Sequence, residues 1–393
     1  MIRHTIKLIW NRKRSLAWIF VEQTLVFGIL LACFIISADK ITQITAKGTI
    51  RVNNVLFVTY LNMDINKFEI DRNEEDDAIF RNIVGRMKEW KSVEMITHAS
   101  GFPEQGNEQY DTITFNDSRF LVSIKYSDEN FYHIFSPKIT EGEWFRNNDV
   151  SEIPPAVITQ LLAEKLKING SPIGQTIFHE GKTYRISGVV EAYKERSHYP
   201  PEPILFMPIS TVENPHEAFA VKIKPNMIAD FSKDFFAEFY RNFSREQFLP
   251  CLLDLNRMSG QLKFIQFNLL LIILAIPTIF LLIFAFLGTF GVVWMQSKKR
   301  MNELGLRMAL GCTPARLQGT IILENLILTT ISMLPGLIVV ANLYAFSPKG
   351  LEWITAVGAA VVVMWLFATF SAWYPARKAA KVMPVEALRL SNN

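Results

Sequence analysis

The chain has 393 residues, of which 50% are hydrophobic and 30 are phenylalanine, while its formal net charge is only +4. A soluble domain of this length is rarely so apolar, and the apolar excess is concentrated in four runs rather than spread evenly. Composition therefore excludes an ordinary soluble protein. Nothing indicates a nucleic-acid partner, because the basic clusters adjoin the apolar runs.

The first apolar run covers residues 16–36 and follows a basic segment. A membrane-spanning helix needs about 20 apolar residues, so this run is long enough to cross. Because the run continues past Cys33 and is longer than a signal-peptide core, we expect an uncleaved helix. Residues 1–14 are either an amphipathic helix on the inner membrane surface or a basic flank that only sets orientation.

One acid, Glu22, lies within the first span. A charge inside a membrane is costly and usually faces protein or water. Two interpretations stay open: a functional polar contact, or a structural hydrogen bond to another helix. A proton relay is not expected, because the other spans contain no chain of acids. Glu324, near the start of the third span, is interpreted in the same way.

Residues 39–263 predict a folded α/β domain rather than a linker. Segments rich in β-branched and aromatic residues predict strands at 52–60, 112–115 and 120–126. The acidic run 71–77 leads into a helical pattern that continues to Met87, and acids at a helix start suit its dipole. We expect that acidic run to be a solvated face, with no metal site.

A subdomain is expected at about 140–202, inserted into this domain. It contains predicted strands at 156–159 and 183–190, a short helix at 161–166 and a turn at 171–174. The proline-rich segment 199–203 marks its end. Strands at 204–207 and 218–223 are then expected to return to the first unit, followed by an amphipathic helix at 227–243.

The second half contains the other three apolar runs, at about 264–294, 317–343 and 353–373. At ~1.5 Å per residue, the helix predicted for 264–294 extends ~46 Å, more than the ~30 Å hydrocarbon core. It must tilt or project outside, and Gln266 and Asn268 favour projection. Our hypothesis is that one rigid helix, shared by the membrane and the outer domain, transmits motion between them.

Basic residues set the orientation of the spans. They cluster before the first run, between the second and third runs, and after the fourth. The positive-inside rule therefore places both termini and the 295–316 loop in the cytoplasm, and residues 39–263 outside. Under this topology Cys33, Cys251 and Cys312 share no compartment, so no intrachain disulfide is expected.

Sequence motifs for chemistry are missing from the chain. It contains no G-x-x-x-x-G-K-[ST] phosphate cradle, and no G-x-S-x-G, H-E-x-x-H or C-x-x-C. The six histidines are scattered without ligand spacing. We therefore expect no enzymatic activity and no catalytic, cofactor or metal site in this chain.

The cytoplasmic loop 300–312, which reads RMNELGLRMALGC, and the tail 374–389, which reads YPARKAAKVMPVEALR, carry a resemblance. They resemble the FtsX-like permeases of ABC transporters, the group that contains MacB, LolC/LolE and FtsX. Glu324 matches an acid common in the family's third span. Segments 140–145, 172–177 and 186–190 are similar to a MacB-type periplasmic domain. Cys312 departs mildly from the family's small residue.

The resemblance implies that the segment at about 298–311 is a coupling helix that docks on an ATPase. Its alternation of charges with leucines also predicts a short amphipathic helix, a common recognition element. The resemblance assigns polar contacts to Arg300, Glu303 and Arg307. Gly305 and Gly311 would permit close approach or a helix end. The site also includes Leu304 and Leu306. The alternative is that these charges only anchor the loop at lipid headgroups.

We therefore expect a membrane α-helical protein with four transmembrane helices and an extracytoplasmic α/β domain between helices 1 and 2. The expected domains are 1–38, 39–263 and 264–393, the last ending in a cytoplasmic tail, 374–393. The resemblance implies a bacterial inner-membrane permease of the MacB/FtsX type. Expected partners are a separate ABC ATPase subunit, a second identical or related permease, membrane lipids and a possible periplasmic partner.

The function implied is mechanotransmission: ATP hydrolysis on the separate subunit would reshape the periplasmic domain. The work would be efflux, lipoprotein release or activation of a periplasmic partner. The alternative is a transmembrane signalling or sensor protein with a ligand-binding outer domain.

Overall fold

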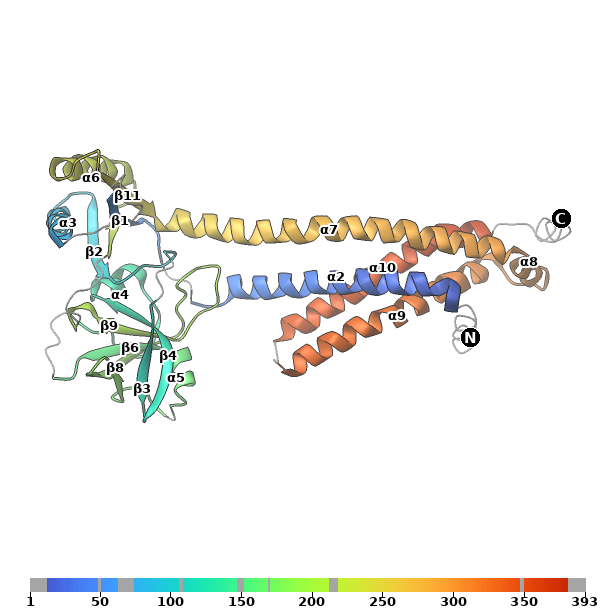
Figure 1. The fold of residues 1–393 in the computed structure, drawn as a ribbon, viewed down its shortest axis with the longest axis horizontal. Coiled ribbons are helices and arrows are strands. Elements are labelled where there is room, and N and C mark those ends of the chain that lie inside the picture. The colour runs from blue at the N-terminus through green and yellow to red at the C-terminus, as the bar shows by residue number, and fades with distance from the viewer. Residues whose placement is uncertain are drawn as a thin grey trace. The chain divides into compact units, whose positions relative to one another are not determined.

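The computed structural model describes residues 13–48, 51–62, 74–105, 109–146, 152–168, 170–211, 218–346 and 350–380. The chain forms two compact units (Figure 1). The outer unit is Gln43–Gln266, and the membrane unit is Met1–Thr42 together with Phe267–Asn393. The surface helix expected at 1–14 falls mostly on residues outside the described ranges, as does the tail after residue 380.

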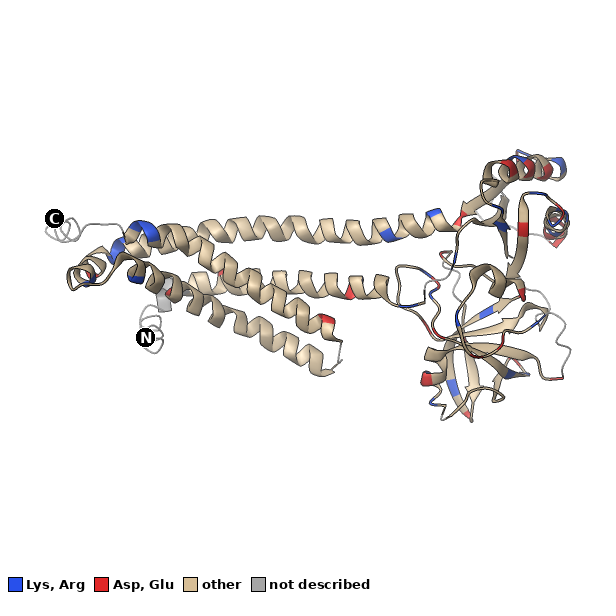
Figure 2. Cartoon of the chain, turned by 180° about the vertical axis from the view of Figure 1, so that it is seen from behind, with Lys and Arg blue, Asp and Glu red and all other residues tan. Residues whose placement is uncertain are grey.

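Four long helices in the described part of the chain are apolar enough to cross a membrane. They are α2 (Lys13–Thr45), α7 (Leu255–Lys299), α9 (Pro314–Phe346) and α10 (Leu351–Ala379). Each contains one of the four apolar runs. Figure 2 shows few charged residues along the middle of these helices, as a hydrocarbon environment requires. Together with the mixed α/β structure of the outer unit, this confirms the expected fold class.

Helix α7 begins earlier than the apolar run that predicts it. It starts at Leu255, directly after strand β11 (Phe248–Asp254), and continues through residue 263 to Lys299. The side chain of Leu255 is fully buried in a hydrophobic cluster of the outer unit. The first turns of α7 therefore belong to the folded outer domain and are not a linker.

The membrane unit is held together by apolar packing and by hydrogen bonds between helices. Phe27, Leu30 and Leu31 of α2 pack in one cluster with Met333 of α9 and Met364 of α10. Asn325 on α9 donates a hydrogen bond to the Ala368 carbonyl on α10 (2.8 Å), and Ser332 donates to the Gln23 side chain on α2 (3.1 Å). Helices in lipid are not driven together by the hydrophobic effect, so close packing and hydrogen bonds of this kind hold them together.

Helix α10 presents small side chains to the inside of the bundle. Every fourth residue is buried, and all but one of these are alanine: Ala356, Ala360, Met364, Ala368, Ala372 and Ala376. Small residues at this spacing lie on one face of a helix and let neighbouring helices approach closely. Close backbone approach is therefore built into α10.

The outer unit contains two groups of strands that share one sheet. In the first group, β1 (Val55–Asn62) pairs antiparallel with β10 (Ala218–Ile223) and β11, and β10 pairs with β2 (Val93–Ala99). Helices α3 (Glu74–Met87) and α6 (Ile228–Asn242) supply the rest of its core. Phe231, Phe235 and Phe239, each four residues apart on α6, are fully buried. The predicted strands at 52–60 and 218–223 and the predicted amphipathic helix are confirmed.

The second group forms a closed circuit of strands. The pairing order is β4 (Ser118–Ser127), β3 (Gln109–Phe115), β7 (Thr176–His179), β8 (Lys182–Val190), β6 (Pro155–Thr159) and β9 (Ile204–Pro208). β9 pairs parallel with β4 and so completes a small barrel. A closed barrel leaves no exposed strand edge in the circuit. Strand β5 (Ile139–Gly142) pairs with β8.

The barrel takes strands from inside and outside the expected insert at 140–202. β3 and β4 precede residue 140 and β9 follows residue 202, yet all three belong to the barrel. Side chains that alternate inward from its strands, including Ile113, Ile124, Ile158, Ile177 and Ile186, form one buried cluster. Helix α5 (Gln160–Lys165) packs there through Leu162, and α4 (Asn130–Phe135) packs in a neighbouring cluster.

Candidate coupling site

A short helix, α8 (Met301–Ala309), connects α7 to α9. Its backbone hydrogen bonding begins where the Leu304 amide donates to the Arg300 carbonyl (2.9 Å). It ends at Gly311, whose φ of +93° is favourable only for glycine, and the Gly311 amide donates to the Met308 carbonyl (3.0 Å). The sequence therefore defines α8 as a separate helix with its own C-terminal stop.

The leucines of this segment point in different directions. Leu304 is buried with Val293 of α7, Leu317 of α9 and alanines of α10, so it fixes α8 to the bundle. Leu306 and Leu310 are 54% and 80% exposed. They are four residues apart, so they lie on one face. α8 therefore has one apolar contact with its own bundle and a second apolar face that is open.

An ionic network also fixes α8 to the bundle. The Arg300 guanidinium donates to the Glu324 carboxylate on α9 through two nitrogens (2.5 and 3.3 Å) and to Glu303 through Nε (3.3 Å). Arg307 then donates to Glu303 (2.5 Å). The structure thus brings together the three charged residues singled out from the sequence and adds Glu324 as their anchor.

The network distinguishes the roles of these charges. The Arg300 and Glu324 side chains are 10% and 19% exposed, while Glu303 and Arg307 are more accessible. Arg300 is therefore engaged within the bundle, and Glu303 and Arg307 are the members that reach water. The sequence did not reveal this pairing, because 24 residues separate Arg300 from Glu324. The signal in the sequence that could have indicated the pairing was Glu324, an isolated acid near the basic loop.

The acid in the first span lies against a neighbouring helix. Glu22 on α2 approaches Gly288 on α7 so closely that a Cβ added at Gly288 would lie 2.5 Å from a Glu22 carboxylate oxygen. Its neighbour Thr24 donates a hydrogen bond to the Ser332 carbonyl on α9 (3.0 Å). Glu22 and Thr24 of α2 therefore face other helices.

The two halves of the chain match two family models. Residues 24–231 match the MacB-like periplasmic core domain, and residues 275–384 match the FtsX-like permease C-terminal domain. The first match alone covers more than half of the chain. The chain belongs to the MacB/FtsX-like family of ABC transporter permeases. Membership of this family implies a partner ATPase subunit. The chain is a multi-pass membrane protein with an extracytoplasmic domain.

Similar proteins include both fused and separate permeases. This MacB/FtsX-like permease is 23% identical to the macrolide export ATP-binding/permease protein MacB of Neisseria gonorrhoeae over 70% of its own length. It spans only 45% of that relative. It is also 23% identical to the ABC transporter permease YknZ of Bacillus subtilis, covering 68% of this chain and 70% of YknZ.

Among solved structures, the chain is similar to the periplasmic region of MacB from Actinobacillus actinomycetemcomitans. The sequence identity is 13% and the TM-score is 0.40, with 54% of this chain and 94% of that region covered.

Proposed function

We propose that this MacB/FtsX-like permease couples ATP hydrolysis on a separate ATPase subunit to conformational change of its periplasmic domain. The observation that carries the proposal is the two-sided construction of α8. One side is fixed to the bundle by Leu304 and by the Arg300–Glu324 pair. The other side presents Leu306 and Leu310 to solvent. An exposed apolar pair on a rigid short helix is suited to a groove on a partner.

Movement of α8 would pass directly to the membrane helices. Arg300 follows the last residue of α7 and pairs with Glu324 on α9, while Leu304 packs with α7, α9 and α10. A displacement of α8 would therefore load three spanning helices at once. Glu303 and Arg307 would make polar contacts with the ATPase around the leucine pair.

We further propose that the protein lies in a bacterial inner membrane with both termini in the cytoplasm, and that it works as a dimer with an identical or related permease. The segments 1–38 and 264–393 form the membrane part, and 39–263 the periplasmic part. Continuity of α7 from the buried Leu255 to Lys299 supports a helix that both parts share. The work done outside would be efflux, lipoprotein release or activation of a periplasmic partner.

The test is co-purification of the full chain with candidate ATPases, followed by ATP hydrolysis in lipid nanodiscs. Replacing Leu306 and Leu310 with glutamine removes two leucine contacts, each worth about 1.5–3 kcal/mol when fully buried. We expect at least a ten-fold weaker complex, since about 1.4 kcal/mol is ten-fold in affinity. Charge reversal at Glu303 or Arg307 is expected to weaken it as well.

The matched control is Leu351→Gln, since this leucine is also well exposed but begins α10, at the opposite end of that helix from its packing on α8. The control should bind the ATPase normally. Unchanged binding and hydrolysis in the Leu306/Leu310 and charge-reversal variants would remove α8 from the mechanism. Membrane insertion must be unchanged in every variant for the comparison to count.

A further inference from the structure

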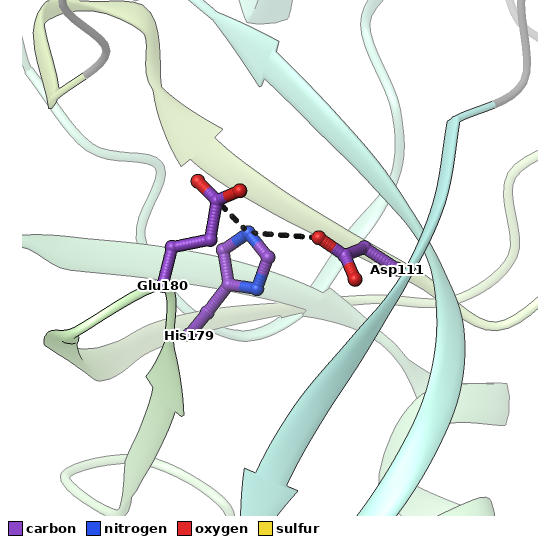
Figure 3. Close-up of side chains that lie close together, drawn as sticks. All are labelled: Asp111, His179 and Glu180. Carbon is purple, nitrogen blue, oxygen red and sulfur yellow. Dashed lines mark ion pairs between the residues drawn. The ribbon is translucent and has the colours of Figure 1, made fainter.

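A cluster of three ligating side chains lies at one end of the small barrel in the outer unit. Asp111 is on β3, His179 is the last residue of β7, and Glu180 is in the turn between β7 and β8. Figure 3 shows both carboxylates directed at the same nitrogen of the imidazole ring. No sequence motif indicates this cluster, because strand pairing joins residues that lie 68 positions apart in the chain.

The local structure makes the placement of these side chains specific. His179 pairs with Lys182, so Glu180 and Gly181 form a two-residue hairpin turn. Both turn residues have positive φ, +45° and +79°, as in a type I′ turn. Alternation along β7 and β3 places His179 on the same face as the buried Ile177, and Asp111 on the same face as the buried Ile113. The cluster therefore lies at the mouth of the barrel.

The three side chains converge but do not form hydrogen bonds with one another. The His179 Nε2 atom lies 4.0 Å from an Asp111 carboxylate oxygen and 3.8 Å from a Glu180 carboxylate oxygen. All three ligand atoms lie within 4.8 Å of one another. These separations are too long for hydrogen bonds. Ligands around Zn²⁺ lie about 2.0–2.2 Å from the ion, so a contraction of under about 1 Å would bring these three atoms into one coordination shell.

Burial suits the imidazole to be the anchor of such a site. His179 is only 2% exposed, and its Nε2 shares a hydrogen bond with the Tyr126 hydroxyl (3.3 Å), which a metal ion on Nε2 would replace. The two carboxylates are exposed, so they can receive an ion from solvent and close on it. The nearby ammonium of Lys182 is bonded elsewhere, because it donates a hydrogen bond to the Thr211 carbonyl (2.6 Å).

We propose that Asp111, His179 and Glu180 bind one divalent transition-metal ion of the Zn²⁺ class, with solvent completing its coordination. One imidazole nitrogen and two carboxylate oxygens form a mixed nitrogen and oxygen set, which suits Zn²⁺ and similar ions. Mg²⁺ and Ca²⁺ prefer more ligands, all of them oxygen. The proposal is independent of coupling at α8.

The expected consequence is a cross-link between β3 and β7, two strands of the barrel that share little pairing. β3 and β4 pair over seven residue pairs and β7 and β8 over four, whereas the pairing between β3 and β7 is Thr114 with Phe178. A metal ion held by Asp111 on one side and by His179 and Glu180 on the other would join the two hairpins between β3 and β7. Metal availability would then set the stability of this end of the outer domain.

The test is metal binding by the full chain in detergent, using Zn²⁺ against a chromophoric chelator and Co²⁺ as a spectroscopic probe. We expect one tight Zn²⁺ per chain and a visible Co²⁺ spectrum of low coordination number. The double variant D111N/E180Q replaces exposed side chains and preserves their size. It should lose at least ten-fold in Zn²⁺ affinity, because loss of outer-shell partners alone costs about 10–100-fold.

The matched control is D117N/E143Q, two exposed acids outside the cluster, which should bind Zn²⁺ as the unaltered chain does. A second readout is hydrogen exchange, in which Zn²⁺ should slow exchange in β3 and in the β7–β8 hairpin only when Asp111 and Glu180 are intact. Failure to bind Zn²⁺, equal binding by the D111N/E180Q variant, or equal competition by Mg²⁺ would overturn the proposal.

Discussion

Two ion pairs in this protein use the same chemistry in opposite surroundings. In the outer unit, Lys125 on β4 donates to both carboxylate oxygens of Glu195 (2.7 and 2.6 Å), and their side chains are 4% and 5% exposed. In the membrane unit, where α8 joins α7 to α9, Arg300 pairs with Glu324, and Glu303 and Arg307 extend the network to water. The Lys125–Glu195 pair is closed off from water (sealed), whereas the Arg300–Glu324 pair is the buried end of a network of charges that reaches water.

The difference separates a sealed structural pair from a network whose outer members, Glu303 and Arg307, can exchange partners. Lys125 also donates to the Gly101 carbonyl (3.1 Å) and lies over the rings of Phe131 and Tyr193. A sealed charge has no substitute partner if its counter-ion is lost, so the pair constrains the fold. A charge that reaches water can exchange partners at low cost. The network around α8 is therefore the one suited to a docking event.

The largest expected effect comes from breaking the sealed pair. Lys125→Met leaves the Glu195 carboxylate buried without its cation, which costs about 3–5 kcal/mol in comparable cases. We expect the free energy of unfolding of the outer domain to fall by that amount. Urea unfolding followed by near-ultraviolet circular dichroism would measure the change, and hydrogen exchange in β4 would localise it.

The double variant K125M/E195Q is the control for this prediction. Removing both charges should recover most of the lost stability, because replacing a buried pair with neutral groups is often nearly neutral. If the double variant is as unstable as Lys125→Met, then lost packing rather than the unpaired charge is responsible.

The next effect concerns a histidine kept neutral in the outer unit. Burial, with the positive charges of Arg81 and Lys88, lowers the pKa of His98 from 6.5 to about 4. Between these values the unfolded chain binds a proton that the folded chain does not. The free energy of unfolding should therefore fall as pH drops from 6.5 to 4, by at most about 3 kcal/mol.

His98→Phe isolates this contribution, because phenylalanine can keep the stacking that His98 makes on Phe219 (4.8 Å between ring centroids). Burial raises the pKa of Asp128, whose contribution has the opposite sign and remains in both proteins. The pH dependence of the urea midpoint should be weaker in the variant over this range. Identical slopes would show that His98 does not titrate as described.

The smallest effect is expected at the open network. Glu324→Gln removes one charge but keeps an oxygen that Arg300 can contact, and Arg300 keeps the Glu303 carboxylate as a charged partner. We expect a local cost of about 1 kcal/mol, seen as a several-fold faster hydrogen exchange in α8 with α9 unchanged. Glu352→Gln, near the start of α10, is the control. A loss as large as that of Lys125→Met would mean that the two networks do not differ as proposed.

The sequence predicted the four spans and many of the strands because their patterns are local. Apolar runs fix the helices whatever their neighbours, and alternation in 183–190 fixes a strand. The start of α7 was missed because polar residues such as Asn256, Arg257 and Ser259 hide its first turns. β11 was also missed, and it contains Pro250, which is unfavourable in most strands.

Relations between distant residues could not be predicted in this way. Closure of the barrel depends on the parallel pairing of β4 with β9, whose partners Ser123 and Ile204 are far apart in sequence. The same is true of Arg300 with Glu324 and of Asp111 with His179. The residues of α8 were identified by resemblance to a family, but which leucine points inward follows only from packing.

The alanine face of α10 has a mechanical consequence. Alanine has no side-chain rotamers, so a surface made of it cannot interlock with its neighbours as leucines or phenylalanines do. If α10 slides or rolls along the alanine positions, contact is exchanged for similar contact, whereas Met364 has to repack and the hydrogen bond from Asn325 to the Ala368 carbonyl has to break. The bundle would then resist separation of its helices but allow α10 small sliding movements along its alanine positions.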